Sequence, residues 1–271
     1  MSWVAKPLAG LLIDITGVLY ESGVGGGWAI PGSCAAIERL RAAGYGLKFC
    51  TNESRITRKH LVELLQTHGF NLTINEVFAP PPACVTYLKE KNLRPFLLVH
   101  PSALSEYSDV DCSNPNCVVV GDACEVFTYE NMNKAFRVLI HGDQPVLISL
   151  GQGKYYKEDG ELALDVGAFS VALEHATGVK PYVIGKPSSV YYKAALKELG
   201  VAPEMALMIG DDLVNDVGGA QSCGMRGVLV RSGKYRESDE HHETVHPDGI
   251  VDNLAHFTDI LLKHQPRAHL V

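Results

Sequence analysis

The chain has 271 residues, of which 46% are hydrophobic and 20% charged, and its formal net charge at pH 7 is −7. These values are typical of a globular protein with one or two domains, and they exclude a disordered or fibrous chain. The negative charge argues against nucleic acid or an anionic membrane surface as a partner, because both bind clustered lysine and arginine side chains.

The first predicted element is an apolar run over residues 11–13 that ends at Asp14 and is soon followed by Gly17. Apolar residues before a carboxylate predict a strand buried on both faces, and open α/β folds place their sites at the carboxyl ends of such strands. Gly17 allows the backbone to turn sharply after the strand. Asp14 is therefore a candidate nucleophile, and the alternative at this point is that it only caps the turn.

A second polar strand end follows. The glycine-rich residues 21–27 lack the spacing of a Walker loop or a dinucleotide fingerprint, and we interpret them as a mobile flap beside Asp14. Helices are predicted over residues 31–43 and 58–68, each closed by a glycine. Between them, a short strand over residues 47–50 ends in Thr51 and Asn52, which repeats the pattern of Asp14.

The proline run at residues 79–82 predicts a boundary or hinge, because prolines stiffen the chain and end regular pairing. A second alternating block follows it. In this block we expect strands over residues 96–99, 117–120, 146–150 and 182–184, helices over 129–140 and 167–177, and a hairpin turn at 158–160.

The third block again alternates predicted strands and helices with polar residues at the strand ends, as the first block does. Lys186 precedes a predicted helix over residues 188–199, and a strand over 206–209 ends in Gly210-Asp211-Asp212. A small-residue helix over 217–223, a strand over 227–230 and a helix over 253–263 complete the chain. The pattern predicts an α/β protein with a Rossmann-like parallel-sheet core, residues 1–79 and 185–271, and an inserted α/β domain, residues 80–184.

The polar residues of these blocks all lie just past strands or at helix starts, and a parallel sheet would bring them to one edge. Gathered carboxylates raise each other's pKa, and their hard oxygens suit Mg²⁺. A magnesium ion with Lys186 would cancel the charge of a phosphoryl group that approaches Asp14. The hydroxyl of Thr51 and the amide of Asn52 are candidates to hold the phosphoryl oxygens.

The four motifs, in this order, resemble those of the haloacid dehalogenase superfamily of phosphatases. They are residues 14–19, Thr51-Asn52, Lys186-Pro187, and Gly210-Asp211-Asp212 with Asp216. The insert resembles the large α/β cap of the class that contains 4-nitrophenyl phosphatases and nucleotide monophosphatases. Within that class, residues 114–117 and 154–157 are among the stretches most similar to the enzymes that hydrolyse phospholysine, phosphohistidine and inorganic pyrophosphate. A related group of haloacid dehalogenase-like hydrolases shares many of these stretches and is the competing assignment.

For the reaction, the resemblance implies that Asp14 becomes an aspartyl-phosphate. It implies that Thr51 and Asn52 bind the phosphate, and that Lys186 steadies both Asp14 and the phosphoryl group.

For the metal, the resemblance implies a Mg²⁺ ion held by Asp14, the main-chain carbonyl of Thr16 and Asp211. Asp212 and Asp216 would lie behind these ligands and position water or ligands.

Thr16 departs from the usual pattern, in which a second aspartate two residues after the nucleophile serves as general acid and base. A hydroxyl cannot do this near neutral pH, and the loss of a general acid or base costs on the order of 10² to 10⁴ in rate. Phospholysine, phosphohistidine and pyrophosphate need such an acid least, so we expect them as substrates. The alternatives are a phosphatase of small phosphomonoesters and a catalytically silent relative that binds phosphoryl groups or a partner.

The seven cysteines form no Cys-x-x-Cys pair, which favours reduced core thiols over a disulfide or zinc framework. No segment has 18 successive uncharged apolar residues, and we expect an intracellular protein that does not bind membranes. The resemblance further implies a homodimer formed through the cap, in the cytoplasm and also the nucleus.

Overall fold

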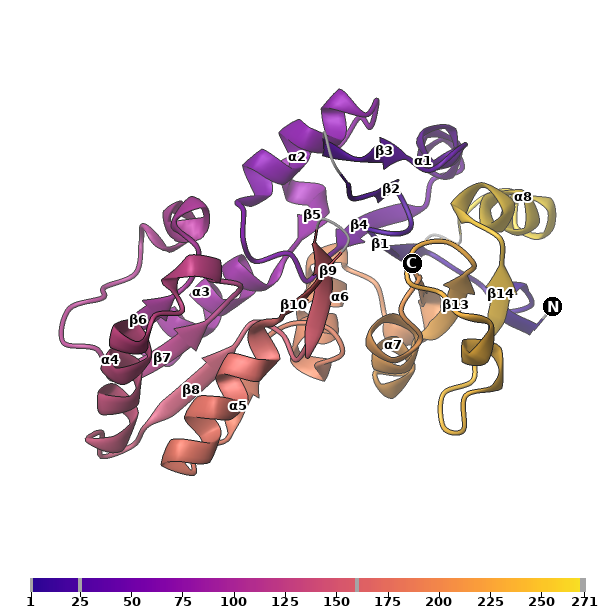
Figure 1. Cartoon of the computed structure of the whole chain (residues 1–271). Coiled ribbons are helices and arrows are strands. Elements are labelled where there is room, and N and C mark those ends of the chain that lie inside the picture. The colour runs from indigo at the N-terminus through magenta and orange to yellow at the C-terminus, as the bar shows by residue number, and fades with distance from the viewer. Residues whose placement is uncertain (1, 24–25, 159–160, 269–271) are drawn as a thin grey trace. The chain divides into compact units, whose positions relative to one another are not determined.

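The computed structural model describes residues 2–23, 26–158 and 161–268. The chain divides into two compact units, each with its own parallel sheet (Figure 1). The first unit comprises residues 1–51, 62–78 and 186–271, and the second comprises residues 52–61 and 79–185. Among the helices of the described ranges, none has the length and apolar character needed to cross a membrane.

The first unit is built on a six-stranded parallel sheet with the strand order β14-β13-β12-β1-β4-β5. The strands are β1 (Gly10–Asp14), β4 (Gly46–Cys50), β5 (Val77–Phe78), β12 (Ala206–Gly210), β13 (Arg226–Val230) and β14 (Gly249–Val251). β1 lies inside the sheet between β12 and β4, and its apolar residues 11–13 are fully buried. The buried run is what the sequence predicts for a parallel strand covered on both faces.

Helices cover both faces of this sheet. α1 (Ser33–Ala42) packs against α8 (Leu254–His264) on one face, and α6 (Ser189–Leu199) packs against α7 (Gly219–Ser222) on the other (Figure 1). α6 is delimited by its caps, because the Ser188 side chain accepts a hydrogen bond from an amide of the first turn and Gly200 ends the helix with a φ of 70°. α2 (Arg58–Thr67) begins in the second unit and continues into the first.

The second unit contains a four-stranded parallel sheet with the order β11-β8-β7-β6 and an antiparallel hairpin. The strands are β6 (Pro95–Leu98), β7 (Cys117–Val120), β8 (Val146–Ser149) and β11 (Pro181–Val183) for the sheet, and β9 (Tyr155–Glu158) and β10 (Glu161–Leu164) for the hairpin. α4 (Tyr129–Ile140) and α5 (Val166–Thr177) pack together over one apolar cluster of this sheet. The hairpin turn predicted at residues 158–160 lies partly outside the described residues.

The proline run is a helix start and not a hinge. α3 (Pro80–Glu90) begins at Pro80, so the prolines occupy its first turn. A proline there loses nothing, because the first amides of a helix have no partner within the helix and the fixed φ of proline is already helical. The boundary that we predicted at this run coincides with a division between the compact units, which falls between residues 78 and 79, and the prolines themselves form the first turn of α3.

Two further segments differ from their predictions. The helix expected over residues 217–223 begins earlier, at Leu213, and its first part, η7 (Leu213–Gly218), has the wider turns of a π-helix before α7 starts. The flap expected over residues 21–27 is flanked by two short strands, β2 (Tyr20–Glu21) and β3 (Trp28–Ala29), which pair antiparallel. Residues 24–25 of the flap lie outside the described residues.

Short 3₁₀ helices lie outside these main elements. They are η1 (Ser2–Val4), η3 (Ile74–Glu76), η4 (Pro101–Tyr107), η5 (Cys124–Val126), η6 (Pro203–Met205) and η8 (Glu237–His241).

The α/β fold class with parallel sheets is confirmed. The expected domain limits, 1–79 with 185–271 and 80–184, stay a prediction, and the compact units differ from them in placing residues 52–61, 79 and 185 with the second unit.

Candidate active site

Three strand ends of the first unit bring polar side chains to one edge of its sheet. In the parallel ladders, Asp14 lies opposite Cys50, the last residue of β4, and Ile13 lies opposite Ile209 of β12. Thr51 and Asp211 follow these two strands, so they leave the sheet at the same edge as Asp14. The structure thus brings together the first-unit residues that the sequence singles out, and their roles in a reaction stay a prediction.

Lys186 is the cation at the centre of this site. Its buried Nζ atom lies 2.6 Å from Asp14 Oδ1 and 2.7 Å from Asp216 Oδ1. Burial alone would lower the pKa of Lys186, but the two carboxylates outweigh burial and hold this pKa above its ordinary value. The lysine therefore stays charged throughout the neutral range.

The carboxylates beside Lys186 ionise less readily than exposed ones. Burial raises the pKa of Asp14 to about 6, although Lys186 opposes the shift. Burial also raises the pKa of Asp216 to about 7, and the nearby charge of Asp14 adds to this. Further positive charge, such as that of a bound cation, would favour the ionised forms of both groups.

The two oxygens of Asp14 are held differently. Oδ1 accepts hydrogen bonds from Lys186 Nζ at 2.6 Å and from the main-chain amide of Ile15 at 2.8 Å. Oδ2 accepts no hydrogen bond from the part of the chain that the structure describes. One oxygen therefore orients the carboxylate, and the other is left to react or to bind a cation.

Asp211 lies in a close-fitting cradle of main chain. Its Oδ2 accepts a hydrogen bond from the amide of Lys234 at 2.7 Å. Gly17 and Gly233 both have positive φ values, 87° and 64°, and a Cβ atom on either would lie 2.0 Å from Asp211 Oδ2. Only glycine permits this approach.

The other oxygen of Asp211, Oδ1, is buried and has no hydrogen-bond partner within the described ranges. Burial, to which Asp216 adds, raises the pKa of Asp211 to about 6. A buried carboxylate oxygen without a donor is costly unless a cation binds it.

A divalent cation fits this arrangement. Asp14, Asp211 and Asp216 each offer one carboxylate oxygen, and these oxygens lie within 4.8 Å of one another. Hard oxygen ligands of this kind suit Mg²⁺, and the unpartnered Oδ1 of Asp211 is the atom most in need of a cation. The half-buried Thr16 follows β1 in the turn, and its main-chain carbonyl remains a predicted ligand.

Asp212 has a structural use. Its Oδ1 accepts hydrogen bonds from the amides of Val214 and Asn215, and its Oδ2 accepts one from the Asn215 side chain. Burial opposes ionisation of Asp212, but the Asn215 amide and the charge of Lys234 outweigh it, so the pKa lies below its ordinary value. The carboxylate therefore caps η7 immediately behind Asp211.

Thr51 and Asn52 fall on either side of the unit boundary. Thr51 is buried in the first unit, where its amide donates to Phe78 O at 3.1 Å and its carbonyl accepts from the hydroxyl of Tyr191 at 2.8 Å. Asn52 is half-buried and begins the second unit. The structure therefore groups Thr51, but not Asn52, with the residues of the first-unit site.

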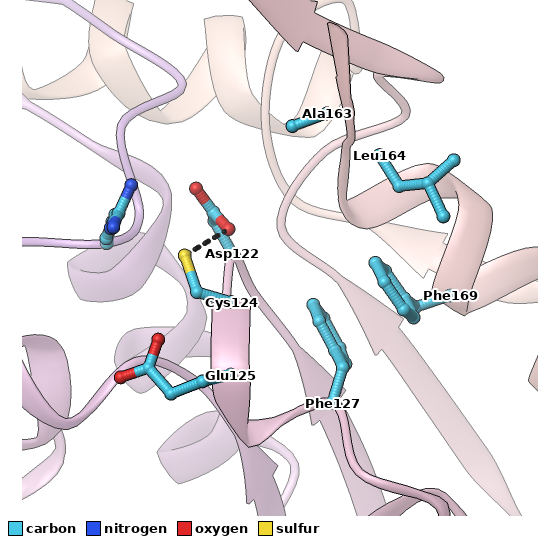
Figure 2. A pocket seen from close by; sticks show the side chains of 8 residues that line it. Asp122, Cys124, Glu125, Phe127, Ala163, Leu164 and Phe169 are labelled. Atoms are coloured by element: carbon cyan, nitrogen blue, oxygen red, sulfur yellow. Dashed lines mark hydrogen bonds between the residues drawn. The ribbon is translucent and has the colours of Figure 1, made fainter. Parts of the chain in front are cut away.

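The second unit has a pocket of its own, with a volume of about 390 Å³. Figure 2 shows the phenyl rings of Phe127 and Phe169 and the side chain of Leu164 on one side, and the carboxylates of Asp122 and Glu125 on the other. The two rings are stacked, with centroids 3.6 Å apart. The lining thus combines an apolar wall with two carboxylates and the cationic side chain of Arg55.

Sequence reasoning missed two contributors to the first-unit site. Tyr191 hydrogen-bonds to the carbonyls of Thr51 and Phe78, and the main chain of Lys234 holds Asp211. Neither residue stands in a motif or at a strand end. The spacing Ser232-Gly233-Lys234 after a predicted strand is the signal that could have pointed to a loop at this edge.

The fold and this site define an α/β protein with a parallel sheet and a buried carboxylate at the end of its central strand. The family model for haloacid dehalogenase-like hydrolases matches residues 11–113, and a second model, for HAD-like hydrolases, matches residues 183–257. The 4-nitrophenylphosphatase from Thermotoga maritima has a similar structure, with a TM-score of 0.85, 24% sequence identity, and coverage of 94% of this chain and 97% of that one. At this identity the likeness shows the fold alone.

Relatives found by sequence have a higher sequence identity to this chain than that structure has. The human phospholysine phosphohistidine inorganic pyrophosphate phosphatase is 56% identical over 255 residues, which are 94% of each chain. The human haloacid dehalogenase-like hydrolase domain-containing protein 2 is 39% identical over 259 residues, which are 96% of this chain and 98% of that one. This chain therefore belongs to the haloacid dehalogenase-like hydrolase family, as its four motifs predict. The sequence analysis left two groups as alternatives. Of these, the phospholysine phosphohistidine inorganic pyrophosphate phosphatases are more similar to this chain than the haloacid dehalogenase-like hydrolase domain-containing proteins 2.

Proposed function

We propose that this chain is a Mg²⁺-dependent phosphohydrolase that transfers a phosphoryl group first to Asp14 and then to water. Its proposed substrates are the phosphorus–nitrogen bonds of phospholysine and phosphohistidine, and inorganic pyrophosphate, as in the names of relatives that are 54% to 56% identical. The observation that carries the proposal is the carboxylate of Asp14, which Lys186 holds by one oxygen while the other is open.

In the first step, Asp14 Oδ2 attacks phosphorus while the bond from phosphorus to the leaving nitrogen or oxygen breaks. This step gives an aspartyl-phosphate and the free leaving group. In the second step, water attacks phosphorus while the bond from phosphorus to Asp14 Oδ2 breaks; one proton of the water passes to the solvent and the other stays with the phosphate product. The carboxylate of Asp14 is then restored.

The neighbouring residues provide charge and orientation. Lys186 fixes Asp14 through Oδ1 and neutralises part of the incoming anion. The hydroxyl of Thr51 and the amide of Asn52 are proposed to hold the phosphoryl oxygens. Mg²⁺, held by Asp14, Asp211 and the carbonyl of Thr16, would supply the remaining positive charge.

Thr16 explains the proposed choice of substrates. Phosphoryl transfer has a loose transition state, so its barrier depends on how well the leaving group accepts charge. An alkoxide leaves poorly without a proton donor, and Thr16 cannot act as one. The nitrogen of phospholysine can carry its own proton, the imidazole of phosphohistidine has a pKa near neutrality, and phosphate is a stable anion.

The covalent intermediate is the direct test. Wild-type protein mixed with ³²P-labelled phosphohistidine and quenched in acid should carry label on Asp14, and the Asp14→Asn variant should carry none and show no turnover. Chelation of Mg²⁺ should abolish both labelling and turnover. Near-normal activity in Asp14→Asn, with deamidation excluded by mass spectrometry, would refute the proposal.

We also propose a homodimer formed through the second unit, active in the cytoplasm and the nucleus. The support is a set of exposed apolar side chains on β10 and α5, namely Leu162, Leu164 and Val171, which are 58% to 71% exposed. Light scattering should give the mass of two chains at micromolar concentration. Leu162→Asp combined with Leu164→Asp should give one chain without loss of the folded state. Imaging of the tagged protein checks its location.

A further inference from the structure

The loop that follows β13 closes over Asp211. Ser232 Oγ donates a hydrogen bond to Gly17 O at 2.6 Å, and the amide of Gly233 donates to Glu21 Oε1 at 3.0 Å. The next amide, that of Lys234, donates to Asp211 Oδ2 at 2.7 Å. Three successive residues of the loop are thus fixed to the turn after β1 and to the carboxylate after β12.

This fixed main chain places the Lys234 side chain at the edge of the site. Its Nζ atom lies 3.8 Å from Asp212 Oδ2, and the side chain is 70% exposed. Asp212 also accepts hydrogen bonds from the amides of Val214 and Asn215, so Lys234 is not the sole support of its carboxylate. An exposed ammonium in so loose an ion pair can turn toward another anion at little cost.

Lys186 cannot serve a second anion in the same way. It is buried between Asp14 and Asp216, with short distances to both. A phosphoryl group that bonds to Asp14 engages this charge fully. Any further anionic group of the substrate therefore needs a different cation, and Lys234 lies on the Asp211 and Asp212 side of the same cluster.

We propose that Lys234 determines specificity for pyrophosphate: its main-chain amide fixes Asp211, and its ammonium group binds the second phosphoryl group. This inference rests on the proposed function. The second phosphoryl group carries ionised oxygens, whereas an amine or imidazole leaving group carries none. The ammonium group of Lys234 therefore favours pyrophosphate over substrates with an amine or imidazole leaving group. The main-chain amide of Lys234 acts through Asp211 and affects both kinds of substrate in the same way.

Steady-state kinetics of Lys234→Gln test the side chain. KM for pyrophosphate should rise about tenfold, as for the loss of one charge-assisted contact, with kcat within about twofold. KM for phospholysine should stay within about twofold of the wild-type value, and Lys234→Arg should keep most of the affinity for pyrophosphate. Lys263→Gln, at an exposed lysine of α8, is the matched control. The effect should shrink as salt rises, because exposed charges are screened.

Binding measurements separate this inference from the proposed function. In the Asp14→Asn background, which removes turnover, calorimetry with Mg²⁺ and pyrophosphate should give a Kd about tenfold weaker when Lys234→Gln is added. Mg²⁺ affinity alone should not fall in Lys234→Gln, because the amide remains. It should fall in Gly233→Ala, whose Cβ would displace Asp211 Oδ2.

Equal increases in KM for both substrates, or an unchanged Kd for pyrophosphate, would overturn the role of Lys234. If the protein hydrolyses none of the proposed substrates, the proposed function fails. The pyrophosphate Kd still decides on Lys234 in that case.

Discussion

Gly17→Ala tests whether the close packing around Asp211 is what prepares the metal site. Gly17 has a φ of 87°, and a Cβ atom there would lie 2.0 Å from Asp211 Oδ2 and 2.6 Å from Asp211 Cγ. Neither distance is compatible with the present position of the carboxylate. Asp211 must move away, and its hydrogen bond from the Lys234 amide must lengthen or break.

The expected cost has two parts. A left-handed backbone costs alanine about 1 to 2 kcal/mol more than glycine. Loss of a hydrogen bond to a charged, buried carboxylate costs about 1.5 to 3 kcal/mol. The free energy of unfolding should therefore fall by about 3 to 5 kcal/mol, and Mg²⁺ affinity should fall by about 10- to 100-fold, as when a metal ligand loses its supporting contact.

Gly200→Ala provides the matched control. Gly200 also has a positive φ, 70°, and lies in the first unit, but a Cβ atom there would have no neighbour within 4 Å. This variant should lose only the backbone part, about 1 to 2 kcal/mol, and keep its Mg²⁺ affinity. Urea unfolding without metal gives the free energies, and calorimetry gives the Mg²⁺ affinities. Equal loss of stability in both variants, with Mg²⁺ affinity intact in Gly17→Ala, would refute the reasoning.

Three further predictions concern the charges of the site. Lys186→Met should abolish turnover and lower the free energy of unfolding by about 3 to 5 kcal/mol, because Asp14 and Asp216 lose their cation. A smaller fall in the free energy of unfolding of the double variant Lys186→Met/Asp216→Asn would confirm the ion pair between Lys186 and Asp216. In the presence of a chelator, the free energy of unfolding should fall as pH rises from about 4 to about 7 and level off above pH 7, because the raised pKa values of Asp14, Asp211 and Asp216 mean that the folded chain binds more protons than the unfolded chain in this range. Urea titrations measure this free energy; added Mg²⁺ should oppose the fall, and a free energy that rises with pH would contradict the prediction. Thr16→Asp should raise kcat/KM for alkyl phosphomonoesters more than for phosphoramidates, by on the order of 10² for the former, and equal gains would count against the account of selectivity.

The main strands could be predicted because their signal is local. Residues 11–13 and 206–209 are continuous apolar runs, which a strand buried on both faces requires, and each ends in a carboxylate. The proline run at residue 80 marks a unit boundary, but its own secondary structure could not be predicted from residue type. The same residue type suits a break in the chain and the first turn of a helix, and only the packing of α3 decides between them.

The motif residues of the site could be predicted from the sequence, but the residues that hold them in place could not. Asp14, Lys186 and Asp211 each stand at an element boundary that the sequence marks. Tyr191 and Lys234 act through a hydroxyl and a main-chain amide, and each reaches residues that are distant in the chain. Any residue type except proline offers an amide, so no composition or spacing could single out Lys234 for that contact.

The first unit is discontinuous in the chain, so part of its sheet can form only after the second unit has been synthesised. β1 emerges first from the ribosome, but its neighbour β12 follows about 190 residues later, after the whole second unit. Synthesis adds about 5 to 20 residues each second, so β1 waits for many seconds with one hydrogen-bonding edge open. The strands of the second unit are contiguous in the chain and can pair meanwhile. A chain that stops before residue 206 would keep that edge exposed permanently, which makes premature termination a direct route to aggregation.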